Sequence, residues 1–442
     1  MIKLPEQVNK AICLLKNSGF EAYAVGGAVR DCLLGKVPFD WDITTSARPE
    51  ETEKVFCGER IIETGIKHGT VTVIIDDMPL EITTYRIDGY YTDHRHPQTV
   101  SFSDNLRDDL SRRDFTINTL CCNCDDKIID VFGGKDDLKN KTIRCVGDPD
   151  IRFSEDALRI MRAVRFSAEL GFKIEKSTSD SILKNRQLLS DVTKERLQVE
   201  FTKLITGKYA TDVIRKYHAV IEVFIPELAP LAECEQHTKY HKYDVFEHTL
   251  HAVDAIDFND RILRLTMFFH DFGKPDAKTT DENGTSHFKG HAVISEKKTR
   301  DILKRLKFDN NTINEVSKLV LIHDMKSPRD KIQAKKMMCS LGDETYLNLI
   351  KIKRADNMAK ADPHAIDEKL KNMRSFYEEI KINNECYNLK SLAVNGDDIK
   401  AFGIAEGKEI KSSLDFLLNG VIEGKCQNRK DVLLEYLKEN TK

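Results

Sequence analysis

No stretch of this chain approaches the roughly 18 consecutive apolar residues that a membrane-spanning helix needs. The segment 1–20 also lacks a signal-peptide layout, because its apolar run at 11–15 is too short and follows polar and charged residues. Internal repeats and low-complexity segments are missing as well. These absences argue against membrane and fibrous proteins, and we expect a cytoplasmic globular protein with no membrane partner.

The chain also lacks a strong charge of one sign, since 69 Lys and Arg residues face 72 Asp and Glu residues and the net charge is −3. Binding to nucleic acid therefore has to use local basic surfaces rather than a global field, and no DNA partner is expected. The 11 cysteines are irregularly spread, which suits a reducing compartment. The one Cys-x-x-Cys, within Cys121–Cys124, has no second pair nearby, so buried strand residues explain it better than zinc ligands do.

A length of 442 residues is too great for a single core and predicts about three domains. Alternating apolar residues in the first third predict short strands, whereas helical periodicity dominates from 150 onward. The fold class is therefore α+β, with a small mixed sheet flanked by helices and a helical remainder. The expected strands are 21–25, 38–45, 70–75, 80–85 and 128–131, and the expected early helices are 1–20 and 28–34.

Two aspartates one residue apart, Asp40 and Asp42, closely follow the glycine pair Gly26 and Gly27. If 38–45 is a strand, both carboxylates point to the same face, because side chains alternate along a strand. Mg²⁺ prefers a couple of carboxylates together with waters and substrate phosphates. The glycines let backbone N–H groups approach phosphate, and the helix after them would direct its N-terminus at the same anion. A lone Gly-Gly or Asp-x-Asp is usually a plain turn or loop, but together they predict a site for nucleoside triphosphate and metal.

Further polar residues on later segments extend this site. Glu81, on the second strand of an expected hairpin, is the candidate third carboxylate, with an exposed strand residue as the alternative. The segment 109–118 carries Arg112 and Arg113, and arginine binds phosphate oxygens through two parallel hydrogen bonds. Asp114 is placed to accept from ribose hydroxyls. A helix terminus with local ion pairs is the alternative reading of this segment.

The segment 150–166 predicts a base-selecting helix that begins at Ser154 as its N-cap. Asp156 and Arg159 are three residues apart and would share one helix face. A carboxylate acceptor beside a guanidinium donor matches an amino group next to a ring-nitrogen acceptor, the edge shared by cytosine and adenine but not by uracil or guanine. The pair would select CTP and ATP without a template. Alternatively, acids in the first turn only complement the helix dipole.

These segments resemble the class II tRNA nucleotidyltransferase and bacterial poly(A) polymerase family, whose catalytic head is DNA polymerase beta-like. The resemblance covers the first half of the chain in ordered blocks and implies addition of the 3′-terminal CCA to tRNA from CTP and ATP, with Mg²⁺ in the head. Thr119 and Ala157 depart from the family's usual alanine and proline without removing a chemical group. The residues it implies are Asp40 and Asp42 as metal ligands, Gly26, Gly27, Arg30, Arg113, Asp114, Asn118, Asp156, Arg159 and Arg162 around the nucleotide, and Glu195 and Arg196 as a supporting neck element.

The polar, aromatic loop 88–97 resembles the flexible element of full CCA-adding enzymes, which enzymes adding only two cytidines tend to lack. This favours full CCA addition over partial (CC- or A-) addition and over poly(A) synthesis. A non-catalytic RNA-binding protein is a further alternative, but it would not need intact metal ligands.

A second set of metal-binding residue types follows: His248, His270-Asp271, His291, His323-Asp324 and Asp356. A single histidine is more often a core or surface residue, but 268–274 closely resembles the motif of HD-domain phosphohydrolases. Imidazole and carboxylate suit a divalent transition metal or Mg²⁺. The resemblance implies a helical HD domain with possible phosphatase or 2′,3′-cyclic phosphodiesterase activity, and a stand-alone HD metal phosphohydrolase is the alternative for the whole chain. The expected domains are a nucleotidyltransferase head (1–148), a helical neck (149–235), the HD domain (236–370) and a tRNA-binding helical tail (371–442).

Overall fold

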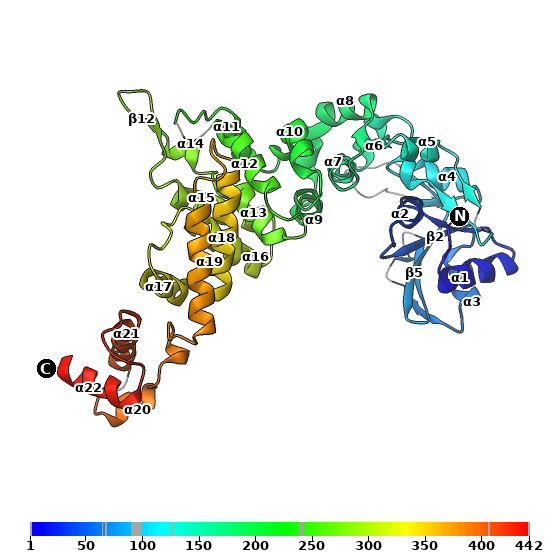
Figure 1. The fold of residues 1–442 in the computed structure, drawn as a ribbon. Coiled ribbons are helices and arrows are strands. Elements are labelled where there is room, and N and C mark those ends of the chain that lie inside the picture. The colour runs from blue at the N-terminus through cyan, green and yellow to red at the C-terminus, as the bar shows by residue number, and fades with distance from the viewer. Residues whose placement is uncertain are drawn as a thin grey trace. The chain divides into compact units, whose positions relative to one another are not determined.

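The structure is a computed structural model that describes residues 2–63, 65–66, 69–89, 100–125, 127–238, 240, 242–404 and 407–440. The chain forms two compact units, one of residues 1–229 with 305–307 and one of residues 230–304 with 308–442 (Figure 1). The domain boundaries expected at 148, 235 and 370 stay predictions. Within the described ranges, no helix has both the length and the apolar character to cross a bilayer.

The first unit contains the expected mixed sheet, whose seven strands follow the order β3-β4-β5-β2-β1-β8-β9. Strands β2 and β5 pair in parallel, and the neighbours on either side of them pair antiparallel. The sheet therefore confirms the α+β class at its coarse level. Its strands are β1 Ala22–Val25, β2 Trp41–Thr45, β3 Arg60–Ile62, β4 Thr70–Ile75, β5 Met78–Thr84, β8 Cys121–Cys122 and β9 Ile128–Ile129.

The β4–β5 hairpin shows how alternation builds this sheet. Every second residue of β4 is buried, as its pattern of threonine, valine and isoleucine predicts. Its turn is Asp76-Asp77, both at positive φ (46° and 64°), which is the backbone of a two-residue hairpin connection. Strand β5 accordingly begins at Met78, two residues before the expected start.

One face of the sheet packs on helices, and the other carries polar side chains beside a small apolar cluster of Val25, Leu110 and Cys121. Helix α1 (Glu6–Asn17) buries Val8 and Ile12 in one core with Ile43 of β2 and Ile82 of β5. Figure 1 shows α1 and α3 (Pro49–Val55) beside the sheet. Because side chains alternate, the residues next to Ile43 and Ile82 in sequence face away from this core.

Helices follow the sheet, and one of them differs from the expectation. Ser154 does not cap a helix: it lies in the last turn of α6 (Pro149–Glu155), whose N-cap is Asp148. Asp156 then leaves the helical conformation (φ −136°, ψ 101°), and α7 (Leu158–Leu170) begins beyond it. Asp148 followed by Pro149 is the stronger start signal, because proline is preorganised for the first helical position. The other α-helices and strands here are α2 Gly27–Leu33, β6 Arg86–Asp88, β7 Val100–Phe102, α4 Leu106–Ser111, α5 Gly134–Lys139, β10 Thr142–Ile143, β11 Lys173–Ile174, α8 Lys176–Asn185, α9 Lys194–Ile205 and α10 Ala210–Ile221.

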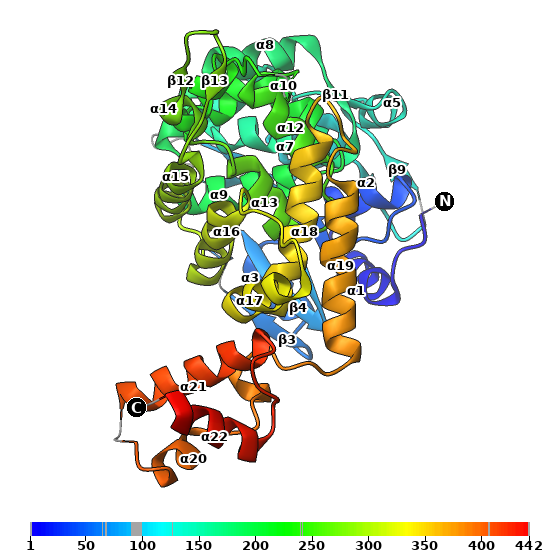
Figure 2. The same cartoon turned by 60° about the vertical axis from the view of Figure 1, so that its left-hand side comes forward.

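The second unit is almost entirely helical, as its periodicity predicts. Helices α12, α13, α16, α18 and α19 pack against one another, and Figure 2 shows α18 and α19 side by side. The last three helices enclose a small separate core that includes Ile399, Leu417 and Leu433. The main helices are α12 Val245–Asp254, α13 Arg261–Phe269, α15 His291–Arg305, α16 Asn310–Ile322, α17 Lys331–Leu341, α18 Asp343–Met358, α19 Asp367–Ile382, α20 Gly396–Ala401, α21 Lys408–Ile422 and α22 Lys430–Asn440.

Candidate active site and candidate metal centre

Three carboxyl groups come together at strands β2 and β5. The parallel register places Asp42 directly opposite Glu81, on the face away from the core. The strand expected at 38–45 begins only at Trp41, so the exposed Asp40 precedes it rather than lying on it. Burial raises the pKa of Asp42 to about 6, and the charges of Glu81 and Asp40 add to this effect. A buried carboxylate with further carboxylates beside it favours a bound cation.

The glycine turn brings Arg113 to the same place. Gly26 has a φ of 83°, in the region that favours glycine. A Cβ atom at Gly26 would lie 3.3 Å from Arg113 Nη1 and 3.7 Å from Asp42 Oδ2. Gly26, Asp42 and Arg113 come from separate segments and were expected at one site, and in the structure they lie close together. Burial acts against the charge of Arg113, but Asp109 and Asp42 keep its pKa above its ordinary value.

Asp109 supports the site through its contacts with other side chains, a role that we did not predict from the sequence. Its side chain is fully buried and pairs with Arg112 Nη2 at 2.6 Å and with Arg113 Nη2 at 3.3 Å. Thr44 of β2 donates its hydroxyl to the same carboxylate at 2.9 Å. Asp109 thus fixes the arginine pair to the sheet. The sequence did hold a signal for this role, because Asp109 lies three residues before Arg112 and four before Arg113.

A hydrogen-bonded chain links four of the expected nucleotide-binding residues. Arg30 Nη1 donates to Asn118 Oδ1 at 2.8 Å, and Asn118 Nδ2 donates to Asp114 Oδ1 at 3.0 Å. Arg162 of α7 donates to Asp114 Oδ2 at 2.7 Å. Burial would raise the pKa of Asp114, but Arg162 and Asn118 hold it at about 2. Gly27 lies beside these hydrogen-bonded residues, because a Cβ at Gly27 would lie 3.7 Å from Arg30 Nη2.

Asp156 and Arg159 lie close in sequence but do not share a helix face, because Asp156 stands between α6 and α7. Asp156 Oδ2 accepts from Arg196 Nη2 of α9 at 2.9 Å. Arg159 donates to Glu155 Oε2 at 2.9 Å and to the Arg112 carbonyl at 2.7 Å. Arg159 and Arg162 therefore tie α7 to the arginine-bearing segment 109–118. Most of the loop expected at 88–97 lies outside the described residues, which stop at 89 and resume at 100.

The second unit brings all six expected metal ligands together from five helices. His248 lies in α12, His270 and Asp271 directly follow α13, His291 begins α15, His323 follows α16, and Asp356 lies in α18. Two groups of three, His248 with His270 and Asp271, and Asp271 with His291 and His323, are spaced to bind a metal. We call these six side chains the histidine–aspartate centre.

The charges of this centre are strongly coupled. Burial would raise the pKa of Asp271, but His270 and Lys274 hold it well below its usual range. Burial and the neighbouring His270 lower the pKa of His323 to about 3, so its ring is neutral at physiological pH. Burial would also lower the pKa of His270, yet Asp271 and Asp356 raise it to about 9. The centre therefore holds carboxylates in their ionised, metal-binding form.

Two lysines that were not predicted as site residues pair with the aspartates of the centre. Lys274 Nζ lies 2.7 Å from Asp271 Oδ2, and Lys360 Nζ lies 2.6 Å from Asp356 Oδ2. Lys274 was visible three residues after Asp271 in the HD-like motif, whereas Lys360 carried no such signal. Both line a cavity of about 370 Å³ that also exposes Asp271, His291 and His323.

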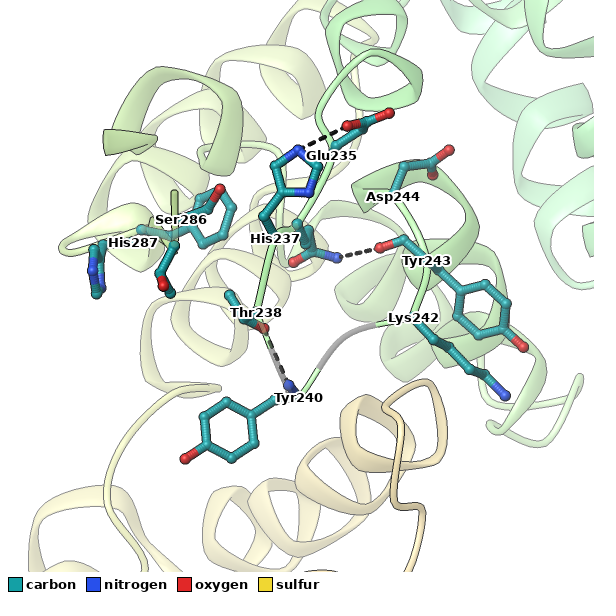
Figure 3. Close-up of a pocket in the computed structure, with 12 residues that line it drawn as sticks. Glu235, His237, Thr238, Tyr240, Lys242, Tyr243, Asp244, Ser286 and His287 are labelled. Atoms are coloured by element: carbon teal, nitrogen blue, oxygen red, sulfur yellow. Dashed lines mark hydrogen bonds and ion pairs between the residues drawn. The ribbon is translucent and has the colours of Figure 1, made fainter. Parts of the chain in front are cut away.

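Two further cavities adjoin this one. One of about 440 Å³ shares His323, Asp356 and Lys360 with it. The other, about 1060 Å³, is drawn in Figure 3, where Tyr240, Tyr243 and His237 surround it. Gln236 in its wall accepts from Lys274 Nζ at 2.7 Å and donates to the Tyr243 carbonyl at 3.2 Å. Gln236 therefore connects this pocket to the histidine–aspartate centre.

Comparison with known proteins matches three family models to consecutive parts of the chain. The "Poly A polymerase head domain" matches residues 22–144, and the "Probable RNA and SrmB- binding site of polymerase A" matches residues 171–231. The "tRNA nucleotidyltransferase domain 2 putative" matches residues 279–437. The first model covers Asp40, Asp42 and Glu81, and the last covers part of the histidine–aspartate centre.

The similar proteins and solved structures compared below are all described as CCA-adding enzymes. A CCA-adding enzyme of Lactobacillus helveticus is 32% identical over 99% of this chain and 98% of its own length. One of Ligilactobacillus salivarius is 34% identical over 99% of this chain and 97% of its own length. The crystal structure of the Bacillus stearothermophilus CCA-adding enzyme in complex with CTP is 30% identical, covers 98% of this chain and 96% of its own, and has a TM-score of 0.72. The Thermotoga maritima CCA-adding enzyme complexed with tRNA shares the fold, with a TM-score of 0.64 at 21% identity over 100% of this chain and 97% of its own.

Proposed function

This chain belongs to the CCA-adding enzyme family of tRNA nucleotidyltransferases, and we propose that it adds the complete 3′-terminal CCA to tRNA from CTP and ATP. The tRNA 3′-hydroxyl attacks the α-phosphate of the incoming nucleotide, a new P–O bond forms, and pyrophosphate leaves. The observation that carries this proposal is the meeting of Asp42, Glu81 and Arg113 at the glycine turn. The family resemblance and the CTP-bound relative support the choice of nucleotide.

We assign the acidic residues Asp40, Asp42 and Glu81 to metal binding. Their fit rests on the raised pKa of Asp42, because three carboxylates gathered around a half-buried position need a compensating cation. Mg²⁺ held there would activate the attacking hydroxyl and neutralise the triphosphate. Arg113, held by Asp109 and within reach of Asp42, contacts the triphosphate on this proposal, and Arg30 assists it.

Base selection is assigned to the junction of α6 and α7. Asp156 offers an acceptor and Arg159 a donor, and Arg196 and Glu155 hold the two side chains in place. Arg159 also bonds to the carbonyl of Arg112, which precedes the triphosphate-contacting Arg113. The support for this role is therefore a direct connection between the proposed base-reading and phosphate-binding residues. We further assign 149–235 to a neck and 371–442 to a tRNA-binding tail.

One assay tests the reaction. The full chain is given tRNA lacking its 3′ end, with labelled CTP, ATP and Mg²⁺, and the product lengths are read on a gel. We expect a product longer by three nucleotides that stops there. Long adenylate tails would instead identify a poly(A) polymerase, and a product longer by only one or two nucleotides with both substrates present would identify a partial CC- or A-adding enzyme.

A second candidate function belongs to the histidine–aspartate centre, which we propose is an HD-type phosphohydrolase site. The supporting observation is its set of imidazole and carboxylate groups, all buried except the part-exposed Asp356, beside a cavity lined with lysines. These donors suit a divalent transition metal or Mg²⁺. Water would add to the phosphorus atom and the ester oxygen would leave with a proton. Hydrolysis of a 2′,3′-cyclic nucleotide by the unmodified chain and its loss in His270→Ala test this, and equal background in both would end the idea.

A further inference from the structure

We infer that Phe166 of α7 is a positioning residue for nucleotidyl transfer, whose aromatic ring keeps Arg30 and Arg162 in place beside the nucleotide. Neither the proposed phosphate contacts nor the proposed base contacts include this side chain. The inference rests on the proposed nucleotide site and adds to it the group that sets the relative placement of two of its arginines.

Three guanidinium groups lie over the ring of Phe166. The Cζ atom of Arg165 lies 3.9 Å from the ring centroid, that of Arg30 lies 4.9 Å away and that of Arg162 lies 5.3 Å away. A cation within about 6 Å of an aromatic face is attracted by the π electrons, and the attraction is greater where water is excluded. Phe166 is only 4% exposed, so little water reaches the ring. The ring therefore attracts three like charges to one place.

Phe166 connects two helices that contribute different parts of the proposed site. Arg30 belongs to α2, which follows the glycine turn, and Arg162 belongs to α7 together with Phe166 and the base-reading Arg159. Phe115 packs edge-on against the ring, with 5.9 Å between the two centroids and 88° between the two planes. The ring is therefore confined, and its place sets the distance between the arginine of α2 and those of α7.

The ring adds a restraint that hydrogen bonds do not supply. A guanidinium group is planar, and its N–H groups donate within that plane. Arg30 donates to Asp31 and to Asn118, and Arg162 donates to Asp114. These hydrogen bonds hold each guanidinium at its edges, whereas the attraction to the ring acts on the charge as a whole. An aliphatic side chain of similar size would pack at this position without that attraction.

Arg165 anchors the ring rather than the nucleotide. Its Nε lies 2.6 Å from Glu200 Oε2 of α9, and its Nη1 lies 2.8 Å from Glu169 Oε2. Two carboxylates therefore compensate the guanidinium that lies nearest to the ring. Arg30 and Arg162 each form an ion pair with a single aspartate, among the residues that the structure describes. We therefore assign Arg165 to the support of the ring and the other two arginines to the anionic ligand.

Fluorinated phenylalanines at position 166 test the inference on the full-length chain. Each ring fluorine withdraws electrons from the ring face and weakens its attraction for cations, while the side chain keeps nearly the same shape. CTP incorporation into tRNA lacking its 3′ end is measured well below the melting temperature of every form. We expect kcat/KM for CTP to fall stepwise from one to three fluorines, by about 10-fold in total, the size expected for desolvated contacts of this kind. KM for tRNA should stay the same, because the two arginines contact the nucleotide.

Phe56 is the matched control, because its buried ring packs in the apolar core with Ile12 and no cation lies over it among the described residues. The same fluorines at Phe56 should leave kcat/KM unchanged. Phe166→Leu, which removes the ring, should lose at least as much turnover as the form with three fluorines. A loss in Phe166→Leu without any response to fluorine would identify a packing residue and overturn the inference, leaving the proposed function intact. No incorporation by the unmodified chain would overturn the proposed function and the positioning role together.

Discussion

Replacing Gly26 with alanine is the sharpest perturbation of the proposed nucleotide site. Gly26 adopts φ 83° and ψ −138°, a region that residues with a Cβ atom rarely enter. The new Cβ would also stand 3.3 Å from Arg113 Nη1, so the guanidinium must move by a few tenths of an ångström. The substitution therefore acts on stability through the backbone and on turnover through Arg113.

The two effects have different sizes. A residue held in such a backbone region costs about 1–3 kcal/mol. A cost of 1 kcal/mol lowers Tm by roughly 2–4 °C in a unit of this length. Because a misplacement of about 1 Å can reduce a rate about 100-fold, a smaller displacement of Arg113 should lower kcat/KM for CTP by about 10-fold.

Gly35→Ala is the matched control. Gly35 also has a positive φ, 72°, but a Cβ there meets no atom within 4 Å. Both variants are compared by thermal melting and by CTP incorporation into tRNA that lacks its 3′ end. We expect both to melt earlier and only Gly26→Ala to lose turnover. Equal turnover in the two folded variants would refute the placement of Arg113 beside the glycine turn.

Three further outcomes follow from the same contacts. Asp156→Ala or Arg159→Ala should reduce the preference for CTP over UTP by about 10-fold or more, since a well-placed base contact is worth about 1–3 kcal/mol. The affinity for tRNA should change little. An unchanged ratio of CTP to UTP incorporation in competition assays contradicts the base-reading role. Arg196→Met should weaken the same preference, because Asp156 loses its 2.9 Å partner. Arg215→Met, which removes another half-buried arginine that pairs with Asp212, should not. Asp109→Asn should destabilise the first unit by about 3–5 kcal/mol, because two arginines lose a buried partner; denaturant unfolding measures this, and a loss below about 1 kcal/mol argues against the pairing.

Local patterns predicted the sheet and the acidic residues well. Alternation in 70–75 and 80–85 placed Glu81 on a strand, and the parallel register with β2 then set it opposite Asp42. The same patterns could not give the start of β2, because Trp41 and not Asp40 is the first residue whose backbone pairs with β5. Strand ends depend on partners that sequence periodicity does not reveal.

Residues whose role comes from burial were the ones that sequence reasoning missed. Asp109 looked like one acid among many, and only its full burial beside Arg112 and Arg113 shows that it organises them. Asp156 was expected in a helix because charge and spacing fit one. The stronger start at Asp148 and Pro149 places the helix earlier, so that Asp156 falls at its end.

The histidine–aspartate centre was predicted as a set of residues but not as a geometry. The spacing of His270, His291 and His323 along the chain says nothing about which ring nitrogens face each other. That depends on the carbonyls at the ends of α13 and α16, which orient the rings. The geometry of the centre therefore emerges only from the packed helices.

The central claim is that Asp42 holds a catalytic cation, and Asp42→Asn tests it most directly. Folding raises the pKa of Asp42 to about 6, above its unfolded value, so its charge costs stability at neutral pH and the neutral amide relieves that cost. We predict that Asp42→Asn melts, in the presence of a chelator, no lower than the unmodified chain, yet incorporates no CTP into tRNA lacking its 3′ end. Near-normal incorporation by this folded variant would contradict the account.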